Sequence, residues 1–266
     1  IVGLGNIGNR YLEGVLSVKD VHEIHIIEKD KNLIQDLSKR YRKEICSKQI
    51  FLTSSIEKLT LRKFLITIVS TTATDRYKIL LNIKSNVDTS YYIIEKVLAQ
   101  SEQQLESIKN LFYNHTNVWI SSPRRSMIWY KEIKKKIFKE KKLSFLVKGY
   151  NWGLACNAIH FIDLVNWITG EKIINIQTNK LNRSWTKAKR NGFLEIMGDL
   201  KIKFTNDVSL TMTCDKDKSN IKNYNIFIKN QNIHLDINEQ RSLAKLNNEE
   251  KINGIFANLS DIIPEV

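Results

Sequence analysis

The chain begins with Ile1-Val2-Gly3-Leu4-Gly5-Asn6-Ile7-Gly8, and this stretch decides the fold. An apolar strand leads into the spacing Gly-x-Gly-x-x-Gly and then into a helix-like run. Two of the glycines allow a tight turn and a close approach of the backbone to a pyrophosphate, and the third lets helix and strand pack closely. The phosphates would lie on exposed N–H groups at the helix N-terminus. We therefore expect Gly3, Gly5, Asn6, Ile7 and Gly8 to contact a cofactor. Methyltransferases and flavoproteins use similar turns, so residues further along the chain must show which of these protein classes the turn belongs to.

The next discriminating residue is Glu28, which ends an expected strand at 22–28. It lies about as far beyond the glycines as the carboxylate that binds the adenosine ribose in dinucleotide-binding domains. Glu28 favours NAD, because a carboxylate would repel the 2'-phosphate of NADP. Lys29 and Lys31 keep NADP as an alternative. The competing interpretation of Glu28 is a solvated strand end.

The composition is that of a soluble globular protein. A chain of 266 residues with 42% hydrophobic content can bury a sizeable core, and this length predicts two domains. No apolar run is long enough to cross a bilayer and no cleavable signal is evident, so we expect no membrane association and a cytoplasmic location. Cys46, Cys156 and Cys214 are scattered and odd in number, which fits a reducing compartment.

Lys and Arg outnumber Asp and Glu by 42 to 28, and the net charge of +14 raises the question of nucleic-acid binding. The basic residues are spread along the chain, however. The densest run, 131–142, alternates with Ile133, Ile137 and Phe138 at helical spacing, as a solvated helix face does. We therefore predict no nucleic-acid binding, and a charge that attracts phosphate-bearing small molecules.

Strands and helices alternate through the first part of the chain. We expect helices at 30–43, 75–84 and 103–113, and strands at 49–52, 64–70, 90–95 and 118–120. This rhythm predicts a Rossmann domain with a doubly wound parallel sheet over residues 1–121.

The pattern changes after Pro123. We expect helices at 126–139 and 155–168, the second ending at Gly170, with a strand at 143–148 between them. Strands then dominate, at 173–181, 193–204, 209–214, 224–229, 233–237 and 242–246. The fold class is therefore α/β, with an N-terminal Rossmann domain and a C-terminal α+β domain over 122–266 that has a mostly antiparallel open sheet.

In a parallel sheet, ligands bind beyond the carboxyl ends of the strands. Thr71, Thr72 and Thr74 follow one expected strand and offer small hydroxyls to a cofactor, and Glu95 and Lys96 end the next. A lysine in this place can exchange a proton with a substrate hydroxyl while a hydride moves to or from nicotinamide. A surface lysine beside a helix start is the structural alternative.

The apolar helix expected in the second domain carries one polar edge. Cys156, His160, Asp163 and Trp167 follow one another at i, i+4, i+7 and i+11. His160 is either a satisfied core histidine or the residue that orients a substrate hydroxyl and shares its proton with Lys96. Cys156 and His160 have a spacing found at zinc sites, but no second ligand pair is evident, so we predict no metal.

Together these residues resemble the Gfo/Idh/MocA family of NAD(P)-dependent sugar and cyclitol oxidoreductases over nearly the whole chain. The resemblance rests on Gly3 to Gly8 with Asn9-Arg10, Thr72-Ala73-Thr74, Glu95-Lys96, Ser122-Pro123-Arg124-Arg125 with Tyr130, and Gly153 to Gly170. Val97 stands where the family has the proline of Glu-Lys-Pro. The resemblance implies cofactor binding in the first domain and homodimers or homotetramers formed through the open second sheet. The chain is short for the family, whose closing helix we expect outside this sequence.

The resemblance also implies roles for individual residues. In the family, an acid and a histidine four residues apart serve catalysis on the substrate-domain helix; His160 matches the histidine, but Cys156 stands in the place of the acid. A thiol hydrogen-bonds a sugar without supplying charge, so proton transfer would fall on Lys96 and His160. The expected substrate contacts are Arg124, Cys156, Asn157, His160 and Asp163, and Glu95 and Lys96 are also expected to contact the cofactor.

The sequence thus predicts an oxidoreductase that transfers a hydride between NAD and the carbinol or keto carbon of a sugar, either nucleotide-linked or acidic. The run 152–157 resembles a subgroup associated with bacterial surface-polysaccharide sugars. The competing hypothesis, motivated by Val97 and Cys156, is a regulatory or binding protein that keeps dinucleotide affinity without turnover. A methyltransferase is disfavoured, because an antiparallel substrate domain follows the parallel sheet.

Overall fold

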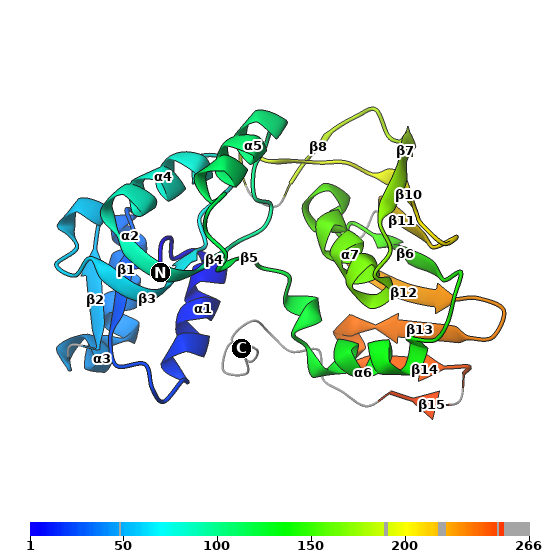
Figure 1. The fold of residues 1–266 in the computed structure, drawn as a ribbon, viewed down its shortest axis with the longest axis horizontal. Helices are drawn as coiled ribbons and strands as arrows, with labels where there is room; N and C mark the ends of the chain where they lie inside the picture. Colours follow the sequence, from blue (N-terminus) through cyan, green and yellow to red (C-terminus); the bar gives the residue numbers. More distant parts are fainter. Residues whose placement is uncertain (48, 189–190, 218–221, 249, 253–266) are drawn as a thin grey trace. The chain divides into compact units, whose positions relative to one another are not determined.

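The computed structural model describes the whole chain except residues 48, 189–190, 218–221, 249 and 253–266. The described residues form two compact units, one over Ile1–Pro123 and one that begins at Arg124. Figure 1 draws both units with their helices and strands labelled. No helix in the described part of the chain is long and apolar enough to cross a membrane.

The first unit is built on a parallel sheet. Its strands are β1 (Ile24–Ile27), β2 (Ile50–Thr53), β3 (Lys63–Val69), β4 (Asp88–Ile94) and β5 (Val118–Ile120). β1 pairs with β2, and β4 pairs with both β3 and β5. Val2 joins the two halves, because it bridges both Ile27 and Val69. Numbered along the chain from the Val2 segment, the strands lie in the order 3-2-1-4-5-6, which confirms the predicted Rossmann sheet.

Helices connect these strands and bury their apolar faces on the sheet. They are α1 (Asn6–Leu16), α2 (Lys31–Arg40), α3 (Arg42–Cys46), α4 (Arg76–Asn86) and α5 (Glu102–Leu111), with a short 3-10 turn η1 (Ile56–Lys58). The single helix predicted over 30–43 is wrong. Tyr41, with φ −110° and ψ 34°, separates α2 from α3, and its partly buried side chain packs on the core around β1. Packing of this residue therefore overrides local helix propensity.

The second unit places helices on one face of an eight-stranded sheet. The helices are α6 (Ile128–Ile137) and α7 (Leu154–Thr169), preceded by the 3-10 turn η2 (Pro123–Arg125). The strands are β6 (Ser144–Tyr150), β7 (Ile173–Leu181), β10 (Gly198–Phe204), β11 (Ser209–Asp215), β12 (Asn223–Lys229), β13 (His234–Asn238), β14 (Leu243–Leu246) and β15 (Glu250–Lys251), with the turn η3 (Glu239–Arg241) after β13.

Their order is β15-β14-β13-β12-β6-β11-β10-β7, and only β6 and β11 pair in parallel. Alternate residues such as Phe145 and Val147 are buried, whereas Lys148 and Tyr150 are exposed. Figure 1 shows α6 and α7 beside the sheet. The mostly antiparallel open sheet predicted from the sequence is confirmed.

The strand predicted over 193–204 is instead two strands. β9 (Leu194–Glu195) pairs with β8 (Thr186–Lys187) in a separate hairpin, and only β10 joins the large sheet. The break is at residues 196–197, and β10 begins at Gly198, whose φ is +106° and where a Cβ would lie 2.4 Å from the carbonyl oxygen of Lys180. Only glycine fits this backbone conformation and this close approach.

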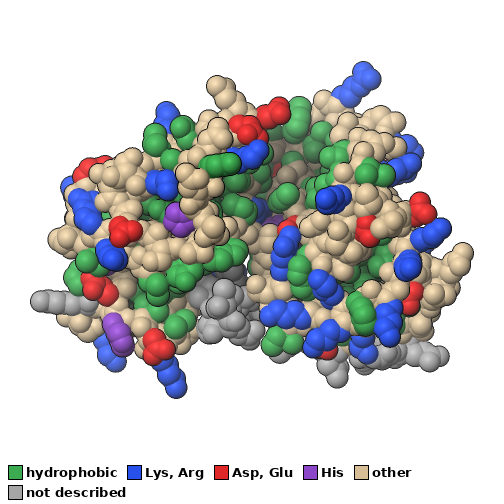
Figure 2. Space-filling view, viewed as in Figure 1, with side chains coloured by type: hydrophobic (Ala, Val, Ile, Leu, Met, Phe, Trp, Pro, Cys, Tyr) green, Lys and Arg blue, Asp and Glu red, His purple; other side chains and the backbone are tan. Residues whose placement is uncertain are grey.

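Charge is dispersed over the surface. Figure 2 shows Lys and Arg side chains on both units of the visible face, with several along α6. The basic run 131–142 thus lies largely on the helix predicted for it.

Candidate active site

The three glycines of the first turn have three different structural roles. Gly3 has φ +86°, a conformation that favours glycine and turns the chain out of the first strand. A Cβ at Gly8 would lie 2.1 Å from the carbonyl oxygen of Gly3, so Gly8 allows α1 to pack against the turn. A Cβ at Gly5 would meet no atom of the described residues within 4 Å. No contact with the described residues therefore requires glycine at position 5, whereas a ligand lying close to the backbone would.

The N-terminus of α1 has the properties of an anion site. Gly5 is its N-cap, no side chain caps the helix, and its first turn contains no acidic residue. The first N–H groups of a helix lack intrahelical partners and attract negative charge. The open space over Gly5 and the uncapped helix end together fit the pyrophosphate of a dinucleotide.

Glu28 lies beside this turn and holds it in place. Its carboxylate accepts hydrogen bonds from the Leu4 N–H at 2.6 Å and the Asp30 N–H at 2.9 Å. Since Glu28 is only 9% exposed, its interpretation as a solvated strand end is wrong. A carboxylate has about four acceptor sites, so it can bind ribose hydroxyls while it keeps these two contacts.

The threonine segment after β3 lies at the same edge of the sheet. Thr72 and Thr74 are exposed, and Thr71 is partly buried against the glycine turn, with its Cγ2 atom 2.9 Å from the place of a Cβ on Gly3. Within the described residues, the Thr71 hydroxyl is buried and has no hydrogen-bond partner. A buried hydroxyl of this kind is a ready donor to a ligand.

Arg76 is a residue that sequence reasoning missed. It is 1% exposed and donates hydrogen bonds to the carbonyl oxygens of Thr71, Glu95 and Val97, the last at 2.6 Å. Arg76 thus joins the segment after β3 to the segment after β4. At the first position of α4 it has the sequence signature of an ordinary solvated residue, so no local signal distinguishes it.

Glu95 and Lys96 follow β4, as expected. Glu95 is buried and accepts a hydrogen bond from the Tyr11 hydroxyl at 2.7 Å. Burial and the Glu95 charge raise the pKa of Tyr11 well above its usual value, so this phenol stays protonated as a donor. The side chain of Glu95 therefore ties β4 to α1. Lys96 is half-buried at the strand end, and its peptide bond to Val97 is cis.

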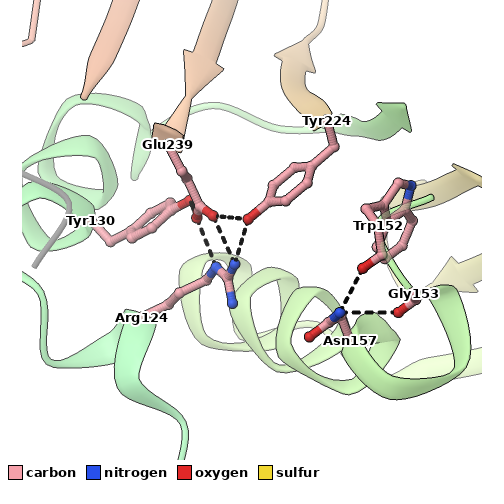
Figure 3. Close-up of polar contacts among 7 residues, drawn as sticks. All are labelled: Arg124, Tyr130, Trp152, Gly153, Asn157, Tyr224 and Glu239. Atoms are coloured by element: carbon pink, nitrogen blue, oxygen red, sulfur yellow. Dashed lines mark hydrogen bonds and ion pairs between the residues drawn. The ribbon is translucent and has the colours of Figure 1, made fainter. Parts of the chain in front are cut away.

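In the second unit, α7 carries the other predicted residues. Cys156 is exposed, and Asn157, His160 and Asp163 are half-buried. The Asn157 side-chain amide donates to the carbonyl oxygens of Trp152 at 2.7 Å and Gly153 at 3.0 Å (Figure 3). Asn157 therefore stabilises the start of α7, and its remaining contribution to a substrate is its side-chain oxygen.

Two adjacent arginines at the start of this unit form different ion pairs. Arg124 binds Glu239 through two hydrogen bonds, at 2.8 Å and 2.7 Å, and Tyr130 and Tyr224 donate to the same carboxylate (Figure 3). Its guanidinium lies 4.6 Å from the Phe161 ring centre. Arg124 is 7% exposed, and these partners bind its guanidinium, so it forms a buried ion pair of the second unit. Its expected contact with a substrate stays a prediction.

The second arginine, Arg125, pairs with Asp163 through two hydrogen bonds, the Nε–Oδ2 bond at 2.7 Å. Asp163 was expected to contact substrate, and the structure shows that both of its oxygens already accept from Arg125. Among the described residues no group of three His, Cys, Asp or Glu side chains is arranged to hold a metal ion.

The structure therefore defines a two-domain α/β protein whose first unit is a Rossmann domain with a ligand-ready glycine turn. No protein-family model matches the sequence, and no curated protein matches it either. Solved structures do match, over nearly the whole chain. A Gfo/Idh/MocA family oxidoreductase from Vibrio cholerae is 15% identical with a TM-score of 0.67, and the match covers 99% of this chain and 84% of that one.

Two further matches have different activities in their names. UDP-N-acetylglucosamine 3-dehydrogenase GnnA from Acidithiobacillus ferrooxidans is 9% identical with a TM-score of 0.70, and the match covers 97% of this chain and 83% of that one. A super-repressor mutant of Gal80p from Saccharomyces cerevisiae is 15% identical with a TM-score of 0.72, and the match covers 99% and 80%. The chain thus has the fold of the Gfo/Idh/MocA oxidoreductases, as its motifs predict.

Proposed function

We propose that this protein is a NAD(P)-dependent oxidoreductase that transfers a hydride between nicotinamide and the carbinol or keto carbon of a sugar or sugar derivative. The observation that carries the proposal is Gly5, where no contact with the described residues requires glycine and where the backbone is open beside an uncapped helix end. The fold shared with a UDP-N-acetylglucosamine 3-dehydrogenase and with a Gfo/Idh/MocA family oxidoreductase supports it. Residues 1–121 would bind the cofactor and residues 122–266 the substrate.

The cofactor contacts follow from the geometry of the first unit. Backbone N–H groups of Gly5 to Gly8 would bind the pyrophosphate, Glu28 the ribose hydroxyls, and the threonines after β3 the nicotinamide half. NAD is the preferred cofactor because Glu28 is buried beside the turn and would repel a 2'-phosphate. When bound, the cofactor supplies the hydride acceptor or donor.

Proton transfer is assigned to this chain's own residues. Lys96 would give a proton to, or take one from, the oxygen on the reacting carbon, and His160 would orient that oxygen and share its proton. Cys156, in the place of the family acid, is exposed and would hydrogen-bond a sugar hydroxyl. Because a thiol brings no charge, catalysis would depend more strongly on Lys96 than it does where the acid is present.

The second candidate is a regulatory protein that binds the dinucleotide without turnover. Two observations favour it: Cys156 replaces the family acid, and the fold also occurs in Gal80p, whose matching structure is that of a super-repressor mutant. Oxidoreductases and a regulator thus share this architecture, so the fold does not decide between the two candidate functions. A measurement of turnover does.

One experiment tests both candidates. NADH binding is followed by fluorescence, and NADH oxidation is then measured over a panel of keto-sugars, free and nucleotide-linked. We expect binding and turnover in the native protein, and unchanged binding with at least about 100-fold lower turnover in Lys96→Ala, the loss typical of a general acid or base. Lys43→Ala, which removes an exposed lysine of α3, serves as the control for loss of a lysine. Tight binding without turnover on any sugar would establish the regulatory candidate, and absence of binding would refute both.

The remaining proposals concern assembly and location. We propose a homodimer or homotetramer formed through the open face of the large sheet, in a cytoplasmic protein. The open face has no helix over it among the described elements. Light scattering of the native protein and of Phe227→Glu, a half-buried residue on this face, tests the assembly.

A further inference from the structure

The β8–β9 hairpin is a distinct element between β7 and β10. Thr186 pairs with Glu195 and Lys187 with Leu194. The hairpin is closed at its base by the hydrogen bond from the Asn182 N–H to the Met197 carbonyl, at 2.9 Å. It is therefore an ordered projection of the second unit and not part of the large sheet.

Glu195 attaches this hairpin to the N-terminal end of α7. Its Oε2 atom accepts a hydrogen bond from the Ala155 N–H at 2.9 Å, in the first turn of the helix. A Cβ on Gly153 would lie 3.0 Å from Glu195 Oε1 and 3.3 Å from the Asn157 side-chain nitrogen. The hairpin base thus lies next to Cys156 and Asn157. Because the Glu195 carboxylate occupies the helix end, an anionic ligand must be held by other groups.

The outer part of the hairpin is basic and carries an exposed tryptophan. Trp185 is 59% exposed, whereas Trp129 and Trp152 in the same unit are 1% and 4% exposed. Arg183 and Lys187 flank it at two residues on either side, are exposed, and form no ion pair within the described part of the chain. The acid of the hairpin, Glu195, is bound to α7.

This combination fits a nucleoside diphosphate. Guanidinium and ammonium groups pair with phosphate oxygens, and an exposed aromatic ring offers a stacking surface to a base. A free sugar has no phosphate to pair with the positive charges and no base to stack on the tryptophan ring. Its hydroxyls would need neutral donors and acceptors, which the polar edge of α7 provides.

We propose that the substrate is a nucleoside diphosphate-linked sugar, and that the β8–β9 hairpin binds its nucleoside diphosphate part. Arg183 and Lys187 pair with the diphosphate, Trp185 stacks on the base, and the sugar lies along the α7 edge at Cys156 and His160. This inference rests on the proposed function, since it names the substrate class of the same site.

The test is the binding of uridine diphosphate, measured by calorimetry in the presence of saturating NADH so that the glycine turn is filled. We expect the native protein to bind it, and Trp185→Ala to bind it about 5- to 100-fold more weakly, the range for loss of one stacked base. The double variant R183A/K187A should lose at least about tenfold, because two charge-assisted contacts are removed.

Matched controls separate the hairpin from general charge and aromatic effects. Trp119→Ala removes a tryptophan that is 51% exposed in the first unit, and K139A/K141A removes two exposed lysines between α6 and β6. We expect both controls to bind uridine diphosphate within twofold of the native protein. Equal losses in hairpin and control variants, or no binding by the native protein, would overturn the inference.

Two further measurements keep this inference distinct from the proposed function. NADH affinity should be unchanged in the hairpin variants, because the glycine turn is untouched. In Trp185→Ala the KM for a nucleotide-linked keto-sugar should rise. The KM for the free keto-sugar should not change. An equal KM change for both sugars would refute nucleotide binding by the hairpin and leave the oxidoreductase proposal standing. Failure to bind NADH would refute the oxidoreductase itself.

Discussion

Replacement of Gly5 by alanine should separate cofactor binding from folding. Gly5 has φ −62° and ψ −171°, a conformation that other residues adopt, and a Cβ there meets no atom within 4 Å in the described part of the chain. Alanine removes no native contact and restricts the unfolded chain, so we expect the free energy of unfolding to stay constant or rise by about 0.4–1 kcal/mol. The methyl group would fill the space proposed for the pyrophosphate. We expect NADH affinity to fall at least about tenfold, or about 1.4 kcal/mol.

Gly8→Ala is the matched variant with the opposite expectation for stability. A Cβ at this position would lie 2.1 Å from the Gly3 carbonyl oxygen and 2.8 Å from Ser70 Oγ, so the backbone of the turn must move. Overpacking of this kind costs about 1–3 kcal/mol. The melting temperature should fall by about 2–4 °C for each kcal/mol lost.

The assay is thermal unfolding without ligand, followed by NADH titration of each variant at a temperature at which it is folded. The reasoning predicts loss of affinity without loss of stability for Gly5→Ala, and loss of stability for Gly8→Ala. Native NADH affinity in Gly5→Ala would refute the assignment of the pyrophosphate to this turn. A melting temperature of Gly5→Ala as low as that of Gly8→Ala would refute the inference that position 5 is free of protein contacts.

Three further predictions concern the second unit. Glu239→Gln leaves the Arg124 charge buried without its carboxylate, so urea denaturation should show a loss of about 3–5 kcal/mol, and a loss below 1 would contradict the buried pair. Burial and Glu239 raise the pKa of Tyr130, so the folded state keeps a proton that the unfolded chain releases above about pH 10. Stability should therefore fall as the pH rises above 10, and Tyr130→Phe should reduce that slope by up to about 1.4 kcal/mol per pH unit; an unchanged slope would contradict the shift. Asp163→Asn breaks a more exposed pair with Arg125 and should cost about 1 kcal/mol in the same denaturation, and a cost as large as that of Glu239→Gln would contradict its exposure.

Much of the fold is predictable from the sequence because its signals are local. The glycine turn, the apolar strands and the amphipathic helices of the first unit each have a recognisable pattern. The exceptions depend on distant contacts. Tyr41 interrupts a helical pattern because its side chain packs on the core around β1, and Gly198 ends the β8–β9 hairpin because β10 approaches the carbonyl of Lys180. Neither partner is close in sequence.

The partners of the two adjacent arginines could not be predicted from the sequence. Arg124 and Arg125 are chemically equivalent in the sequence, and either is suited to an anionic substrate. Their roles are set by Glu239, which is 115 residues from Arg124, and by Asp163, which is 38 residues from Arg125. A pairing over such distances has no local signature, so only the structure shows that Arg124 is enclosed by a carboxylate and two tyrosines.

The position of Lys96 depends on residues that belong to no recognisable sequence motif. Arg76 donates to the carbonyl oxygens on both sides of Lys96, those of Glu95 and Val97, and Tyr11 holds the side chain of Glu95. The backbone at the proposed proton donor is therefore fixed from α4 and, through Glu95, from α1, the helix that follows the glycine turn. A lysine can meet a bound nicotinamide only if its own strand end and that turn keep a constant spacing. The Tyr11–Glu95 hydrogen bond supplies this link, because it joins the strand end that carries the proposed proton donor to the helix that follows the glycine turn.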